Sequence, residues 1–259
     1  MPTIQDEMVF VEFCSDGTVV RIGVYVDDLL VTLANREQRH RERAQSAELL
    51  RQLKERFKMT SGSGESGLHF LGMELERDSD GSILIKNENA IEILYKEFAG
   101  TWPELFKGCT FDSPMREERL TQIKPHEDIV PEEDFAYRRL VGSLLHLSRT
   151  CRPNMAYAVS ELSRHLGRAG ARHVDQSVRA LKYIFHTKSK GIRYGRDVKP
   201  SKRNKLIAFT DADWAGDQDT FKSRSGFILF LNGGPVDWLS KGQTVVSLSS
   251  CESETIGAT

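Results

Sequence analysis

The sequence predicts an α+β fold, with strands toward both ends of the 259-residue chain and helices between them. Residues 18–26 and 206–210 are rich in β-branched and aromatic side chains, as is typical of strands. Residues 135–149 instead place leucine and valine at helical spacing over several turns. The hydrophobic share of 39% is sufficient for packed cores on both kinds of element.

The N-terminal segment is predicted to open with a three-stranded antiparallel meander. Its strands are expected at residues 8–13, 18–26 and 29–33, so that Asp27 and Asp28 lie at the tip of the second hairpin. A charged helix is expected next, over residues 36–58, because Asn35 can cap it and five apolar residues recur at helical spacing. These five residues are Ala44, Ala47, Leu50, Leu53 and Phe57.

Shorter elements are predicted to continue the chain as far as residue 134. A Gly/Ser-rich linker occupies residues 61–67, and a second hairpin is expected around the turn Asp78-Ser79-Asp80-Gly81. Its strands are residues 68–76 and 82–86, and a helix follows near residues 88–98. Residues 100–134 contain several prolines and many charges, which predicts an irregular connector.

The second half of the chain is predicted to contain three helices and then strands. The helices are expected at residues 135–149, 152–166 and 171–186, the second starting at Arg152-Pro153 because proline suits a first helical turn. Residues 188–205 are expected to form a basic loop. The strands that follow are residues 206–210, 226–231 and 236–239, the last two joined by the turn Asn232-Gly233-Gly234-Pro235. The extended run 244–248 then leads to a helix capped by Ser249-Ser250.

The charges are unevenly distributed, although the net charge of the whole chain is only −1. Residues 1–137 carry 16 basic and 27 acidic side chains, residues 138–205 carry 17 and 3, and residues 206–259 carry 3 and 7. A strongly basic block between two acidic blocks is typical of a protein that binds a polyanion beside sites that hold cations.

Other features of the composition exclude a membrane-spanning or secreted protein. No apolar run approaches the roughly 20 residues that a transmembrane helix needs, and the first residues lack the pattern of a secretory signal. Four cysteines lie far apart in the sequence, which favours reduced thiols over a zinc site. They are Cys14, Cys109, Cys151 and Cys251.

Two adjacent carboxylates at a hairpin tip form the first candidate site. In the segment Tyr25-Val26-Asp27-Asp28 the two aspartates repel each other unless a counter-charge is near. Carboxylate oxygens suit Mg²⁺, which also binds substrate phosphates. The alternative is that aspartate is simply a common turn residue. Because the apolar strands on both sides are expected to be buried, a metal site is a competitive interpretation.

The second candidate site consists of acidic residues near the C-terminal end. Asp211 directly follows an apolar strand, a usual place for a metal-binding carboxylate. The other acidic residues are Asp213, Asp217, Asp219, Glu252 and Glu254.

The third candidate site is the basic block. Its helices carry far too few acids to be ordinary solvated surfaces, so we expect several of its bases to contact phosphates. Histidines His146 and His165 within the block are expected to pack or cap rather than to catalyse. The candidate bases are Arg138, Arg139, Arg149, Arg152, Arg164, Arg168, Arg172, Arg179, Lys182 and Lys188, with Tyr157, Tyr183 and His173 interleaved among them.

Several stretches resemble the reverse transcriptases of copia-type retrotransposons, and they occur in the order of that family. The catalytic hairpin of the palm is similar to VYVDDLLVT, and the strand pair after it to LHFLGMELERDSDGSILI. The connection region resembles YRRLVGSLLHLSRTCRPNMAYAVSELSRHL and LKYIFHTKSKGIRY. The start of the RNase H domain resembles FTDADWAGD, KSRSGF, GGPVDWLSKGQ and VSLSSCESE.

This resemblance implies three parts. Residues 1–134 would be the C-terminal part of a reverse-transcriptase palm with a thumb-like hairpin and helix. Residues 135–203 would be a basic helical connection, and residues 204–259 the N-terminal part of an RNase H-like α/β domain. The fingers, the first half of the palm with its third metal-binding aspartate, and the later part of RNase H have no counterpart in this sequence.

The resemblance also implies roles for individual residues. Asp27 would be the main ligand of two Mg²⁺ ions, supported by Asp28, and Tyr25 would lie beside the primer terminus. Asp211 and Glu254 would be carboxylates of a second two-metal site that cleaves RNA, although Thr255 stands where the family normally has tyrosine. The remaining acids, Asp213, Asp217, Asp219 and Glu252, are expected to be solvated charges.

The leading hypothesis is therefore a fragment of a retrotransposon RNA-directed DNA polymerase with RNase H, inactive in isolation because both active sites are incomplete. Its expected partners are template–primer, RNA–DNA hybrid, deoxynucleoside triphosphates and the rest of the Pol polyprotein, inside the cell in a cytoplasmic particle or the nucleus. One alternative is a decayed or co-opted remnant that binds nucleic acid without catalysis. Another is a gene-model fragment that makes no stable protein.

Overall fold

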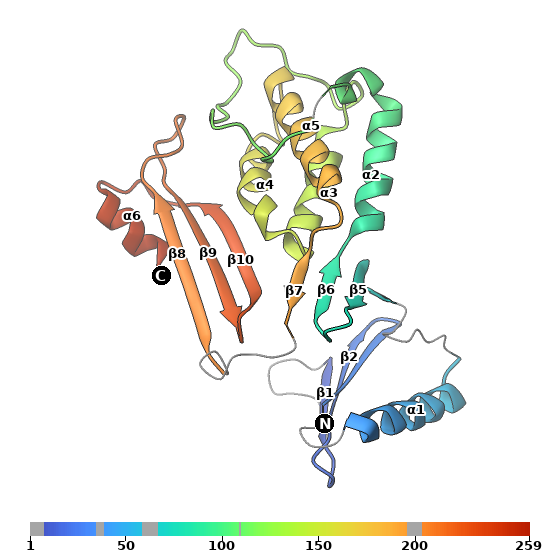
Figure 1. Ribbon diagram of the computed structural model, residues 1–259. Helices are drawn as coiled ribbons and strands as arrows, with labels where there is room; N and C mark the ends of the chain where they lie inside the picture. Colours follow the sequence, from blue (N-terminus) through green and yellow to red (C-terminus); the bar gives the residue numbers. More distant parts are fainter. Residues whose placement is uncertain (1–7, 35–38, 59–66, 109, 196–203) are drawn as a thin grey trace. The chain divides into compact units, whose positions relative to one another are not determined.

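The computed structural model describes residues 8–34, 39–58, 67–108, 110–195 and 204–259. Helices and antiparallel sheets are both present among them, which confirms the α+β class (Figure 1). The chain divides into two compact units, Met1–Glu76 and Arg77–Thr259, which we call unit 1 and unit 2.

Unit 1 contains the predicted meander, formed by β1 (Val9–Phe13), β2 (Val19–Tyr25) and β3 (Asp28–Ala34) in that order. Tyr25 pairs with Asp28, so the hairpin turn consists of Val26 and Asp27 alone. Val26 adopts the left-handed conformation (φ 53°) that such a tight turn requires. The expectation of buried strands is wrong, because Val20 is the one buried apolar residue among the described residues of this small unit.

A charged helix, α1 (Arg39–Arg56), follows the meander as predicted. The expected cap Asn35 lies outside the described residues, as does the side chain of Ala44. Leu50 and Leu53 are half-buried whereas Phe57 is 61% exposed, so the predicted apolar stripe is only partly covered.

The single strand expected at residues 68–76 is wrong. Leu71 and Gly72 both have positive φ, at 52° and 73°, and form a tight turn in the middle of the segment. The chain therefore makes a hairpin of β4 (Leu68–Phe70) and β5 (Met73–Arg77), with Phe70 paired to Met73. The linker expected at residues 61–67 lies outside the described residues except for Gly67.

Helices dominate the first part of unit 2. After β6 (Ile83–Lys86), α2 (Glu88–Thr101) packs with the three helices predicted farther along the chain around one hydrophobic core (Figure 1). The core also holds Tyr137, which is 2% exposed and whose hydroxyl donates to the Leu162 carbonyl at 2.9 Å. The three predicted helices are α3 (Tyr137–Thr150), α4 (Ala156–Ser163), which is preceded by the short η2 (Pro153–Met155), and α5 (Ala171–His186).

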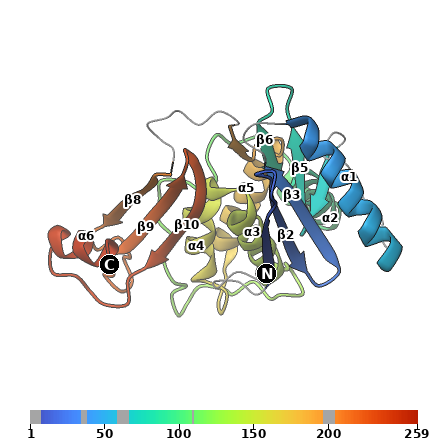
Figure 2. The same ribbon diagram turned by 90° about the horizontal axis from the view of Figure 1, so that it is seen from below.

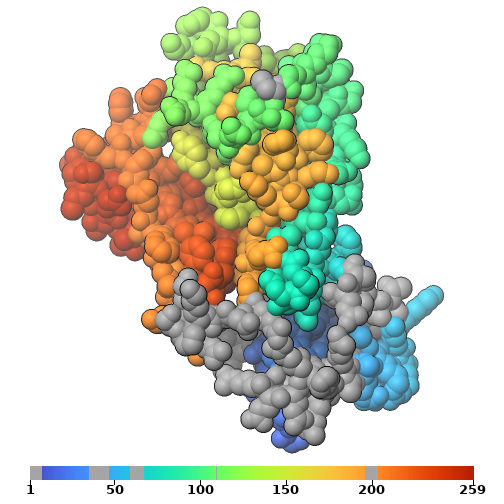
Figure 3. Space-filling view, in the orientation of Figure 1, coloured from blue at the N-terminus to red at the C-terminus, as the bar shows by residue number. Residues whose placement is uncertain are grey.

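The connector predicted between the helices is irregular apart from η1 (Pro103–Phe106) and the last turn of α2. It is nevertheless packed onto the helices, because Met115 and Leu120 are buried in the same core. In the space-filling view its atoms lie over the helical part of unit 2 (Figure 3). This irregular segment can therefore supply side chains to a site built on the helices.

The C-terminal strands form an antiparallel sheet of their own, in the order β10-β9-β8. Ser249 caps the final helix as predicted, because its hydroxyl accepts from the Glu252 backbone N–H at 3.1 Å. The Glu252 carboxylate in turn accepts from the Leu248 backbone N–H at 2.6 Å. The elements are β8 (Leu206–Asp213), β9 (Arg224–Leu231), β10 (Gly234–Gly242) and α6 (Ser250–Gly257).

Two expectations in this region are wrong. The basic loop over residues 188–205 contains a strand, β7 (Ile192–Tyr194), because Ile192 pairs with Ile85 of β6. The run 244–248 is not a strand: it lies between β10 and α6 without strand pairing, and Leu248 is 85% exposed.

The sheet of β8, β9 and β10 is attached to the helices. Trp238 of β10 is 8% exposed, and its indole N–H donates to the Ser148 carbonyl of α3 at 2.8 Å. The view from below likewise shows β10 beside α4 (Figure 2). Among the described residues, no helix is long and apolar enough to cross a membrane.

Two buried histidines, one beyond the end of α4 and one on α5, pack against each other with tilted rings. The ring centroids of His165 and His173 are 4.1 Å apart, and His173 Nδ1 accepts from Gly170 N at 3.1 Å. Burial lowers the pKa of both rings, that of His165 to about 3. The neighbouring His173 and the charges of Arg164 and Arg172 lower the pKa of His165 further, and the charge of Arg172 also lowers that of His173. His165 therefore packs in neutral form, as expected.

This depressed pKa predicts a pH dependence of stability. Because the unfolded ring titrates near about 6.5, the unfolded chain binds more protons than the folded chain below that pH. The free energy of unfolding should therefore decrease from pH 7 to pH 5, and less steeply in His165→Leu than in the wild type. Urea midpoints at pH 7, 6 and 5 measure both slopes, and equal slopes would contradict the assignment.

Candidate nucleic-acid interface and carboxylate sites

Asp27 and Asp28 lie at the tip of the β2–β3 hairpin, as predicted. Both are exposed, and Tyr25 beside them is 58% exposed, so a ligand can reach all three. Two adjacent carboxylates fit part of the oxygen-ligand set of Mg²⁺, an ion that binds through one or two carboxylates and keeps several waters. Within the described residues, no group of three or more His, Cys, Asp or Glu side chains is placed to hold a metal ion.

Asp211 lies within β8 rather than after it, because the strand continues to Asp213 and Asp211 pairs with Gly226. Glu254 lies on α6, which packs closely on β8: a Cβ added to Gly257 would approach the Ala212 Cβ to 3.2 Å. The glycine thus brings the helix that carries Glu254 against the strand that carries Asp211. Both carboxylates are exposed, and no bond joins them in the described part of the chain.

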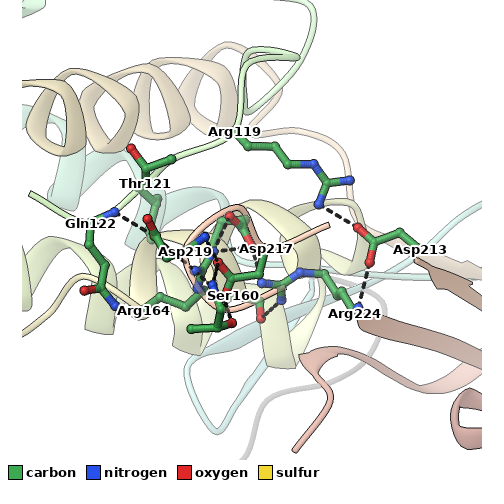
Figure 4. Close-up of polar contacts among 12 residues, drawn as sticks. Arg119, Thr121, Gln122, Ser160, Arg164, Asp213, Asp217, Asp219 and Arg224 are labelled. Carbon is green, nitrogen blue, oxygen red and sulfur yellow. Dashed lines mark hydrogen bonds and ion pairs between the residues drawn. The ribbon is translucent and has the colours of Figure 1, made fainter. Parts of the chain in front are cut away.

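The expectation of solvated charges is wrong for Asp213 and Asp217, which are partly buried and ion-paired, whereas Asp219 is exposed. Asp213 pairs with Arg119 of the connector at 2.6 Å and accepts from Arg224 N at 2.6 Å. Asp217 pairs with Arg164 at 2.6 Å, and Asp219 accepts from Gln122 N at 2.7 Å (Figure 4). Burial opposes ionisation of Asp217, but hydrogen bonds from Thr220 and the charge of Arg164 keep its pKa below the ordinary value.

A buried ion pair joins these acids to the helices. Glu161 of α4, 2% exposed, binds both Arg224 of β9 and, at 3.1 Å, Arg164. Arg224 also donates to the Ser160 hydroxyl at 2.5 Å. Sequence reasoning missed this pairing, since only three acids occur in residues 138–205 and Arg224 lies outside the basic block. We call the whole set the ionic cluster: Arg119, Glu161, Arg164, Asp213, Asp217, Asp219 and Arg224.

Much of the basic block is engaged within the protein. Arg152 is 1% exposed and donates to the Thr187 carbonyl and hydroxyl at 3.1 and 2.6 Å and to the Asn154 side chain at 3.2 Å. Burial lowers the pKa of its guanidinium. Five other bases bond to the connector, to α2 or to the ionic cluster: Arg164, Arg172, Arg179, Lys182 and Lys188.

Some basic residues of α3 are exposed to solvent, unlike the bases that are engaged within the protein. Arg138, His146 and Arg149 are exposed and recur on one face of the helix, with Gly142 between them. Arg138 uses its Nε–H to bond the Leu166 carbonyl at 2.9 Å, which leaves the other guanidinium N–H groups for a ligand. Arg168 is also exposed, beyond α4.

An open groove of about 600 Å³ lies between α2 and α3 on this face. Its floor is apolar and contains Ile93, which is 59% exposed, together with the buried Leu94 and Leu147. Its rim is cationic, and its single acid, Glu97, is paired with Arg139. The lining residues are Ala90, Ile93, Leu94, Glu97, Arg138, Arg139, Gly142, Ser143, His146 and Leu147.

Over most of its length the chain is similar in sequence to curated transposon proteins. A Retrovirus-related Pol polyprotein from transposon RE1 of Arabidopsis thaliana is 31% identical over 92% of this chain. A Putative transposon Ty5-1 protein of Saccharomyces cerevisiae is 29% identical over 94% of this chain and 73% of its own length. A Secreted RxLR effector protein 161 of Plasmopara viticola is 38% identical over 47% of this chain and 83% of its own length.

The match to the Pol polyproteins covers only part of those proteins. The chain spans about 15% of the length of the Arabidopsis RE1 and RE2 polyproteins. No protein-family model matches the sequence, and no solved structure matches it.

Proposed function

Because this chain belongs to the Pol polyproteins of retrotransposons, we propose that it is the segment of a copia-type Pol that joins the end of reverse transcriptase to the start of RNase H. In this proposal its helices hold template–primer or RNA–DNA hybrid. The α2–α3 groove is the observation that carries the proposal, because it combines an apolar floor with cations that the fold leaves available.

The chemistry of the groove suits the edge of a duplex. Sugar C–H groups are apolar and can contact Ile93, while the flanking phosphates face Arg138 and His146 of the lining. Arg149 is exposed on the same face of α3, outside the lining. Gly142 has nothing within 4 Å of the position of a Cβ, so the groove has room there for a side chain beside a bound ligand. Recognition of this kind reads shape and charge rather than base sequence.

The carboxylates supply the chemistry of the family in this proposal. Asp27 and Asp28 would bind Mg²⁺ for nucleotidyl transfer, and Asp211 with Glu254 would bind Mg²⁺ for cleavage of the RNA strand. Further ligands would come from other segments of the polyprotein. The isolated chain therefore binds nucleic acid but incorporates few or no nucleotides.

A charge placed in the groove tests the proposal. Gly142→Glu should weaken binding of an 18-base-pair RNA–DNA hybrid by roughly tenfold or more. The carboxylate repels the phosphates, and it loses its water when the hybrid covers the groove. The fold should tolerate the change, since the site is open and glycine is a poor helix former. Fluorescence anisotropy at several salt concentrations measures the affinity.

Gly142→Gln is the matched control, because glutamine has the same shape without the charge. It should bind the hybrid within about threefold of the wild type, whose affinity should fall steeply with salt. If Gly142→Glu and Gly142→Gln bound the hybrid equally well, the groove would not be the interface.

A further inference from the structure

A second cavity lies beside the ionic cluster, between α4 and the strands β9 and β10. It measures about 130 Å³ and is more enclosed than the α2–α3 groove. Three separate parts of the chain supply its cations: Arg119 of the connector, Arg164 beyond α4, and Lys222 and Arg224, of which Lys222 precedes β9 and Arg224 begins it. Figure 4 shows Arg119, Arg164 and Arg224. Segments more than one hundred residues apart thus place positive charge around one small space.

The lining of this cavity contains four cations and two carboxylates, Glu161 and Asp217. Glu161 is bound by Arg224 and Arg164, and Asp217 by Arg164. Asp213 and Asp219 of the ionic cluster are not part of the lining but pair with Arg119 and Arg164. Lys222 is partly buried and forms no ion pair with any described residue. This lysine is therefore the cation of the lining that the neighbouring carboxylates leave available to a ligand.

One hydroxyl of the lining is also incompletely used. The Ser160 hydroxyl, which accepts from Arg224, still has its own proton to donate. An occupant that accepts hydrogen bonds would use this proton.

We propose that this cavity binds one inorganic oxyanion of phosphate size. A water molecule has a share of about 30 Å³ in the liquid, so the cavity has room for about four waters or for one tetrahedral anion with a water. Lys222 and the Ser160 hydroxyl supply donors, and Arg119, Arg164 and Arg224 add positive charge around the anion. The bound anion links the connector, α4 and β9, and it is independent of the α2–α3 groove.

The cavity favours a free anion over a phosphate within a nucleic-acid strand. A backbone phosphate carries a sugar on each side, and these would have to enter the same enclosed space. The two sources share the phosphate chemistry, so the experiment includes both of them. The first ligand is sodium phosphate at pH 7.5, and the second is a single-stranded 12-mer DNA, each compared with sodium chloride at equal ionic strength.

Thermal unfolding of the full chain provides the readout. Phosphate should raise the unfolding midpoint in a saturable manner at millimolar concentration, because a ligand that binds only the folded state stabilises it by mass action. Lys222→Gln should raise the phosphate concentration needed for half of that effect at least fivefold. Lys241→Gln, which removes an exposed lysine of β10, should leave it unchanged.

Each other outcome would overturn the proposal. Equal midpoints in phosphate and chloride would show that the cavity holds only water. A rise that is the same in Lys222→Gln would place the anion elsewhere. A Lys222-dependent rise with the DNA but none with phosphate would make the cavity a contact for a nucleic-acid backbone rather than a site for a free anion.

Discussion

Arg224→Met is expected to lower the free energy of unfolding of unit 2 by about 3 kcal/mol, because breaking a buried ion pair leaves its partner uncompensated. Glu161 is 2% exposed and the Arg224 side chain 10% exposed, so water cannot replace the lost guanidinium. Arg164 remains 3.1 Å from Glu161 and offsets part of the loss. The Arg224 bond to Ser160 is lost as well.

Urea unfolding followed by tryptophan fluorescence measures this effect, since Trp102, Trp214 and Trp238 all belong to unit 2. Glu161→Gln in the Arg224→Met background should restore part of the stability, because the uncompensated charge is then removed. Arg116→Met provides a control: its pair with Asp175 is about half exposed and contributes at most about 1 kcal/mol. An Arg224→Met protein as stable as that control would show that the pair does not hold the sheet to α4.

Arg152→Met is expected to cost about 2–4 kcal/mol of stability. The guanidinium is fully buried and satisfies the carbonyl and hydroxyl of Thr187 and the side chain of Asn154. Methionine fills most of the volume but donates no hydrogen bond, so buried acceptors lose their partners. This residue joins the end of α5 to the turn before α4, and its loss should loosen both helices.

The same variant tests whether Arg152 contacts nucleic acid. At a temperature where it stays folded, Arg152→Met should bind RNA–DNA hybrid as the wild type does, because the side chain is only 1% exposed. The control is Arg168→Met, an exposed base that should change stability by less than about 0.5 kcal/mol. A loss of hybrid affinity in Arg152→Met with unchanged stability would contradict the structural role.

The elements with strong periodicity could be predicted from the sequence. The helix expected at residues 171–186 has those bounds in α5, and the β2–β3 hairpin lies where the apolar runs and the Asp27-Asp28 pair indicate. The break within residues 68–76 could not be predicted, because Leu71 is an unusual residue at positive φ. Strand β7 could not be predicted either, because it is only three residues long and depends on its pairing with β6. In that pairing Ile192 lies opposite Ile85, which is 107 positions earlier in the sequence.

For the candidate sites, the sequence predicted which types of residue are present but not which of them meet in the folded chain. Charge counting identified residues 138–205 as basic, but whether a base contacts solvent or a partner depends on packing. Arg152 and Arg149 are three positions apart, yet one is buried and the other exposed. Arg119 lies in an irregular connector, and nothing in the local sequence predicts that it meets Asp213 of β8. Such pairings require the tertiary structure.

Binding and primer extension on one preparation of the chain test the central claim most directly. The same labelled RNA–DNA template–primer is used for both, with Mg²⁺ or with EDTA and with the Gly142→Glu and Asp27→Asn variants. The account predicts that hybrid binding persists in EDTA and in Asp27→Asn, falls roughly tenfold or more in Gly142→Glu, and is accompanied by no incorporation above background. Mg²⁺-dependent incorporation that Asp27→Asn abolishes, together with wild-type binding by Gly142→Glu, would contradict it.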